Sequence, residues 1–180
     1  MNCWKTINLS KDFGFQRLLL ISLITMISAF ISFYVPLNFI HSNVQLQEDH
    51  FLLFMCFIFI TFIVHKLLHF IVLIACGQKV SLKMEMLLFY PQLRIRACHS
   101  ISKNLMLLSL VTPFVILTPI FLWASVYFPQ YYHYFAMLAA FHTGCCVPDF
   151  IYIRQLVFAP KYSLVEEDKD DFEILIQNKH

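Results

Sequence analysis

Residues 51–76 read FLLFMCFIFITFIVHKLLHFIVLIAC, an almost unbroken apolar run interrupted mainly by two histidines and one lysine. A helix needs roughly 20 predominantly apolar residues to cross the hydrocarbon core of a bilayer. The run therefore predicts a membrane-spanning helix, and the three ionisable side chains inside it are its most informative feature.

Three further stretches, at about residues 18–40, 105–128 and 131–158, are long and apolar enough to span. The chain is 59% hydrophobic and 13% charged and has three glycines, which excludes an ordinary soluble domain. The first stretch is followed by no small-residue cleavage site and is expected to stay as an anchor. We predict an all-α integral membrane protein, a four-helix transmembrane bundle that forms a single domain over residues 1–180 and contacts membrane lipid.

The distribution of Lys and Arg predicts the orientation of the four spans, because cytoplasmic connections carry an excess of both. Three basic residues precede the first span, the connection 41–50 has none, and the connection 77–104 has five. Both termini and the long middle connection are thus expected on the cytoplasmic side of a cell membrane. This bias also accounts for the net charge of +2, and the chain has no basic, aromatic-interleaved patch that would predict nucleic-acid binding.

The middle connection alternates apolar and polar residues at two places, 80–86 and 93–97, with Tyr90-Pro91-Gln92 between them. Alternation at period two around a turn predicts a small hairpin at about residues 79–98. Such a hairpin could cap the bundle, or its edge could pair with an extended segment of a client protein. The tail, residues 159–180, is expected to be a solvated acidic segment with a short apolar stretch at 172–176.

His65 and His69 are four residues apart, so on a helix both imidazoles lie on one face. This spacing is the metal-binding half of the His-Glu-x-x-His signature of zinc peptidases. The second position is Lys66, where the signature has the glutamate that deprotonates the attacking water. The sequence keeps the ligands of a metal and lacks the usual general base.

The fourth span carries a second polar set, made of His142, Cys145, Cys146 and Asp149. Counted from the cytoplasmic end of each span, Asp149 has a depth between those of His65 and His69. Two histidines and one carboxylate form a catalytic-type zinc set, and the two cysteines and His142 are additional candidate ligands for a softer metal. Pro148 predicts a kink or break directly before Asp149.

A reading without metal explains the same residues. Asp149 is the only acidic residue within the four spans, and a buried ammonium needs a partner, so Lys66 and Asp149 could form a structural ion pair. The histidines would then be hydrogen-bonding groups, and the cysteines would be small hydrophobic side chains.

The order of these features resembles a known family. A span with His-x-x-x-His, a short hairpin, a span that contains Thr112-Pro113, and the final sequence 142–149, HTGCCVPD, are similar to small bacterial membrane proteins grouped as putative zincin peptidases. That family is distantly like the site-2 intramembrane metalloproteases, and the resemblance covers roughly residues 51–176. It implies a zinc site of His65, His69 and Asp149, and this chain departs from the family's motif at Lys66.

Three functional hypotheses follow. The first is a degenerate metallopeptidase that binds metal, membrane-protein clients, or both. The second is an active membrane metallopeptidase in which Glu85 of the hairpin replaces the missing base. The third is a transport or assembly subunit that binds no metal and contains the structural Lys66–Asp149 pair.

Overall fold

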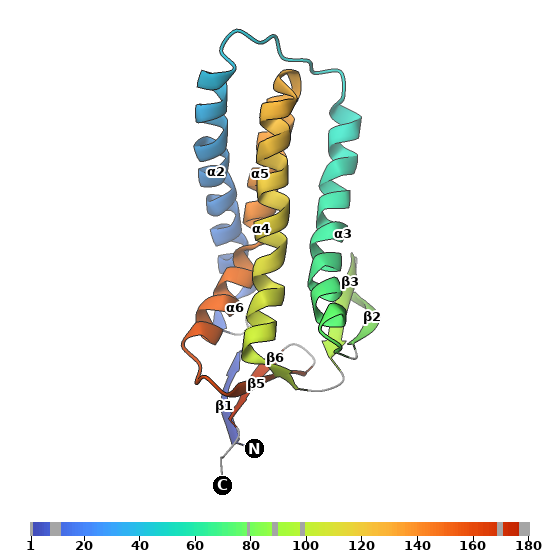
Figure 1. The fold of residues 1–180 in the computed structure, drawn as a ribbon, viewed down its shortest axis with the longest axis vertical. Helices are drawn as coiled ribbons and strands as arrows, with labels where there is room; N and C mark the ends of the chain where they lie inside the picture. The colour runs from blue at the N-terminus through green and yellow to red at the C-terminus, as the bar shows by residue number, and fades with distance from the viewer. Residues whose placement is uncertain are drawn as a thin grey trace. The chain divides into compact units, whose positions relative to one another are not determined.

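The computed structural model describes residues 2–7, 12–78, 80–87, 90–97, 100–168 and 171–176. Most of the described chain is helical (Figure 1). The helices are α2 (Phe15–Ile40), α3 (Phe51–Ala75), α4 (Lys103–Tyr127), the short 3-10 helix η1 (Pro129–Tyr131), α5 (Tyr132–Cys145) and α6 (Val147–Val157). The strands are β1 (Asn2–Ile7), β2 (Val80–Leu87), β3 (Tyr90–Ala97), β4 (Ile101–Ser102), β5 (Ser163–Asp168) and β6 (Asp171–Ile176).

The helices coincide with the stretches predicted to span a membrane. Among the described residues, three helices are long and apolar enough to cross, or four if the bent pair α5 and α6 is one span. Many of their large apolar side chains are exposed, for example Phe39 at 78% and Leu52 at 81%. Exposed apolar surface of this extent is expected of helices that contact lipid. The prediction of a mostly helical chain with several potential spans is confirmed, and the orientation and the single membrane domain stay predictions.

The strands form two antiparallel sheets, of which the sequence predicted one. The hairpin of β2 and β3 is present, with Val80 opposite Ala97 and Leu87 opposite Tyr90. The second sheet has four strands in the order β1-β6-β5-β4, and it joins the N-terminal residues to the tail (Figure 1). The prediction of an all-α chain with one hairpin was therefore incomplete. The tail alternates polar and apolar residues over part of its length, which is the pattern of a strand with one buried face.

The chain divides into two compact units, one made of Met1–Phe15, Lys66–Thr112 and Asp149–His180, the other of Gln16–His65 and Pro113–Pro148. In the first unit the four-stranded sheet packs against the adjoining helical residues. Lys103 links the start of α4 to the end of α6, because its Nζ donates hydrogen bonds to the carbonyl oxygens of Val157 (3.1 Å) and Ala159 (2.5 Å). The buried core of this unit is Ile7, Leu73, Ile101, Met106, Leu110, Leu156, Ala159, Val165 and Ile174.

In the second unit, α2 and α5 approach closely near the end of α5. A Cβ atom placed on Gly144 would lie 3.0 Å from Cβ of Met26 and 3.1 Å from the carbonyl oxygen of Ser22, so only glycine fits without a shift. Towards the start of α5 the packing is aromatic: the hydroxyl of Tyr132 donates to Oδ1 of Asn38 at 2.8 Å. Close packing of α5 fixes the backbone that carries the polar residues at its end.

Candidate metal centre

The two histidines of α3 are among the few buried side chains of that helix, with His65 3% exposed and His69 7% exposed. They are separated by one helical turn of a continuous helix, as the sequence predicted. Imidazole groups in an apolar segment need polar partners. The partners of each ring therefore indicate what the site can do.

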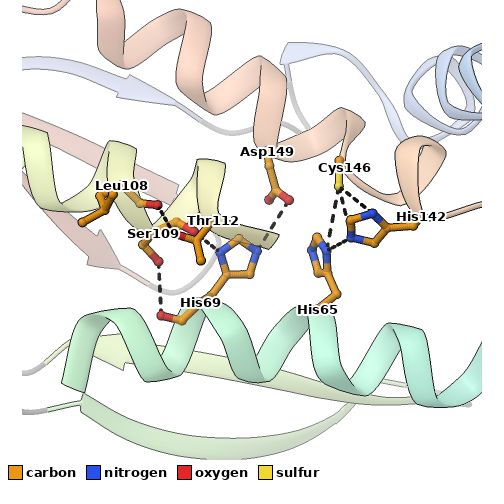
Figure 2. Close-up of polar contacts among 8 residues, drawn as sticks. All are labelled: His65, His69, Leu108, Ser109, Thr112, His142, Cys146 and Asp149. Atoms are coloured by element: carbon orange, nitrogen blue, oxygen red, sulfur yellow. Dashed lines mark hydrogen bonds and ion pairs between the residues drawn. The ribbon is translucent and has the colours of Figure 1, made fainter. Parts of the chain in front are cut away.

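The ring of His69 is oriented by α4. Its Nδ1 lies 2.9 Å from the carbonyl oxygen of Ser109, and the hydroxyl of Ser109 donates to the carbonyl oxygen of His69 at 3.2 Å (Figure 2). A carbonyl oxygen only accepts, so Nδ1 is the protonated nitrogen and, in the neutral ring, Nε2 carries the lone pair. Metal-binding histidines characteristically donate their other ring N–H to a carbonyl or carboxylate in this way.

Asp149 faces that lone pair. It lies in the first turn of α6, where a negative charge is favoured by the helix dipole, and Figure 2 shows its carboxylate pointing at His69. The distance from Oδ2 to Nε2 of His69 is 3.5 Å. A charge-assisted N–H···O bond is about 2.7–2.9 Å long. Two ligands of one tetrahedral zinc ion, bonded at about 2.0–2.2 Å, are about 3.3–3.5 Å apart, which matches the observed distance.

His65 contacts a second imidazole. Its Nδ1 lies 3.2 Å from Nε2 of His142 (Figure 2). The Nδ1 atom of His142 lies 3.0 Å from the hydroxyl of Thr118. Both ring nitrogens of His142 thus have polar neighbours, although the side chain is buried among apolar helices. The sequence predicted His142 only as an additional candidate ligand, and the structure places it against His65.

Cys146 completes this cluster at the break between α5 and α6. Its Sγ lies 3.6 Å from Nε2 of His142 and 3.9 Å from Nδ1 of His65. The helix is interrupted at Cys146, before Pro148, because a proline cannot donate to the carbonyl four residues earlier. The predicted break is therefore confirmed and begins three residues before Asp149. No cysteine of the described chain forms a disulfide, so Cys146 is a thiol.

Two sets of described residues could hold a metal ion: His65, His142 and Cys146, and His65, His69 and Asp149. The three-residue set that the sequence selected is one of them. Cys145, the other cysteine considered, belongs to neither. Ser109 and Thr118, which orient two of the histidines, were not predicted as site residues. The signal for both was an isolated hydroxyl residue in an apolar span.

Lys66 follows His65 and is half-buried. Among the residues that the structure describes, Lys66 forms no ion pair with Asp149, whose carboxylate is placed against His69 instead. Glu85, considered as a substitute base, has a side chain outside the described part of the structure. Position 66 thus carries a lysine where the His-Glu-x-x-His signature has its glutamate.

Residues 58–164 match the model of a family described as Putative zincin peptidase. The chain belongs to this family. The matched range contains both histidines of α3 as well as His142, Cys146 and Asp149, and it confirms the predicted membership of this family. The likeness to site-2 proteases and the bacterial origin stay predictions. No curated protein and no solved structure matches the chain.

Proposed function

We propose that this protein is a membrane metallopeptidase-like protein that binds zinc through His65, His69 and Asp149 and does not hydrolyse peptides. The observation that carries the proposal is the arrangement of His69. Its Nδ1 is anchored on the carbonyl of Ser109, and its Nε2 is directed at the carboxylate of Asp149 at 3.5 Å. A nitrogen lone pair and a carboxylate repel each other unless a cation, a proton or a metal ion, lies between them.

The donor set fits zinc. Two imidazoles and one carboxylate are the ligands of many catalytic zinc sites, with a fourth position left open. His65 precedes His69 by one turn of α3, so the helix itself sets the spacing of the two rings. Zinc bound there would supply Lewis-acid polarisation of a carbonyl group. Membership of a zincin family supports the same assignment.

Lys66 is the reason to propose an inactive protein. A protonated lysine has three donors and no acceptor, so it cannot take a proton from an attacking water. Asp149 is the only carboxylate in the spanning helices, and as a metal ligand it would be occupied. Retained ligands without a base favour a role in binding membrane-protein clients. The β2–β3 hairpin offers sheet edges to which an extended client segment could add by backbone hydrogen bonds.

Zinc content of the purified protein tests the metal assignment. We expect about one zinc per chain in the wild type, and its loss in His69→Ala and in Asp149→Ala, because each removes a ligand. His133→Ala is the matched control: it removes a histidine of α5 that belongs to neither candidate set and should leave the zinc content unchanged. Zinc retained by both ligand variants would refute the proposed site.

Catalysis is tested separately with membrane-peptide substrates. We expect no zinc-dependent cleavage by the wild type. Cleavage that requires zinc and is abolished by His69→Ala would establish the alternative, an active membrane metallopeptidase.

A further inference from the structure

Three donor atoms outside the peptidase-like pair of His69 and Asp149 converge at the end of α5. They are Nδ1 of His65, Nε2 of His142 and Sγ of Cys146, and all three residues are buried. A buried thiol can pack as a small hydrophobic side chain without polar neighbours. Cys146 instead has two imidazole rings against its sulfur.

The separations of these atoms are those of ligands around one ion. Two imidazole nitrogens bound to a tetrahedral zinc ion are about 3.3–3.4 Å apart, and a nitrogen and a thiolate sulfur are about 3.5–3.6 Å apart. The observed distances are 3.2 Å between the nitrogens, 3.6 Å from sulfur to His142 and 3.9 Å from sulfur to His65. In the metal-free protein the 3.2 Å contact also suits an N–H···N hydrogen bond, whose proton a metal ion would displace.

His142 is held for this task by a contact of its own. The hydroxyl of Thr118 lies 3.0 Å from Nδ1, and the rest of the ring is enclosed by the helices. A partner on Nδ1 fixes the ring orientation and directs Nε2 at His65 and Cys146, as the outer partners of metal-bound histidines do.

We infer that His65, His142 and Cys146 form a second metal position, for a borderline or soft transition-metal ion that takes imidazole and thiolate ligands. It shares His65 with the zinc site proposed above. A neutral imidazole has one lone pair, so His65 can complete only one of the two sets at a time. A thiophilic ion therefore takes His65 away from the peptidase-like set, and each chain holds one fully liganded ion. The sharing rests on the proposed function; the second position itself does not.

The test is a metal titration of the full-length protein in detergent, after removal of bound metal with a chelator. Addition of Co²⁺ or Cd²⁺ should produce the near-ultraviolet thiolate-to-metal charge-transfer absorption in the wild type. Cys146→Ser should abolish this absorption, and His142→Ala should weaken the binding at least tenfold. Cys145→Ser is the matched control, because it removes the adjacent thiol and should leave the absorption unchanged.

A measurement on the wild type guards against variants that fail to fold. X-ray absorption at the cadmium edge of the Cd²⁺-loaded wild type should detect one sulfur neighbour in addition to nitrogen. A shell of nitrogen and oxygen alone, or an absorption band that survives in Cys146→Ser, would overturn the inference. Two fully bound ions per chain would overturn the sharing of His65.

The failure of this inference and that of the proposed function are distinguishable. If the second position exists alone, the charge-transfer absorption persists in His69→Ala and Asp149→Ala, and zinc content does not depend on either residue. If only the peptidase-like site exists, zinc is lost in those two variants and no thiolate absorption is seen.

Discussion

Thr118→Val removes one hydroxyl from α4 and leaves the shape of the side chain nearly unchanged. In the wild type that hydroxyl lies 3.0 Å from Nδ1 of His142, and the two residues are 4% and 0% exposed. Water cannot replace the lost partner at such burial. The variant therefore leaves one nitrogen of a buried imidazole without its neighbour and loosens the ring that presents Nε2 to Cys146.

Two estimates of the free energy lost in Thr118→Val agree. A buried polar group that loses its partner costs about 1–3 kcal/mol. Loss of an outer partner of a metal-bound histidine lowers metal affinity by about 10–100-fold, which corresponds to about 1.4–2.7 kcal/mol. We expect the dissociation constant for Co²⁺, measured through the thiolate absorption against a competing chelator, to rise by this factor.

Thr112→Val provides the control on the same helix. Its hydroxyl donates to the carbonyl oxygen of Leu108 at 2.6 Å, within one turn of α4 (Figure 2). Substitutions that remove only such a local hydrogen bond usually change the free energy of unfolding by no more than about 0.5 kcal/mol. Equal Co²⁺ affinities in the two variants would refute the role given to Thr118 and weaken the case for His142 as a ligand.

Three further outcomes are expected. Lys66→Glu supplies the missing base and should allow weak zinc-dependent cleavage of membrane peptides, whereas Lys66→Gln, which removes only the charge, should not; equal activity of the two would argue against a base at this position. Gly144→Val should lower the free energy of unfolding by about 1–3 kcal/mol, because a Cβ at this position would already lie 3.0 Å from Cβ of Met26 and the valine methyl groups need further room. An unchanged midpoint of thermal unfolding in detergent would contradict the close approach of α2 and α5. Reporter fusions should give an external signal in the connection 41–50 and a cytoplasmic signal in the connection 77–104, and the reverse pattern would invert the orientation.

The helices were predictable because lipid imposes a simple rule on length and composition. Three apolar stretches became single helices within a few residues of their predicted ends, for example Phe51–Ala75 for the predicted 51–76, and the fourth became α5 and α6. The four-stranded sheet was not predicted, since it joins β1 at the start of the chain to β5 and β6 at its end. Pairing of strands more than 150 residues apart leaves no local signal, and the acidic residues of the tail pointed to a solvated segment.

The sequence predicted which residues belong to the candidate site, but only in part which of them contact one another. Helical spacing placed His65 and His69 on one face, and depth counting matched Asp149 to them. The same counting gave only height along the membrane normal, so it could not assign His142 to His65. That contact depends on how the helices are rotated about their axes, which is set by side-chain packing such as that at Gly144.

The four donor-to-donor distances constrain the choice between a metal and a purely hydrogen-bonded network. They are 3.5 Å for His69 and Asp149, and 3.2, 3.6 and 3.9 Å within the His65, His142 and Cys146 cluster. A charge-assisted hydrogen bond between His69 and Asp149 would be about 2.7–2.9 Å long, so their 3.5 Å separation is that of two ligands and not of an optimised ion pair. The three distances of the second cluster suit hydrogen bonds in the metal-free protein, and they are also within about 0.4 Å of the separations expected for tetrahedral zinc ligands. Ionisable groups are costly inside apolar helices, so a cluster of them needs a compensating partner. Donor atoms that lie at the spacing of metal ligands are expected where a bound cation is that partner.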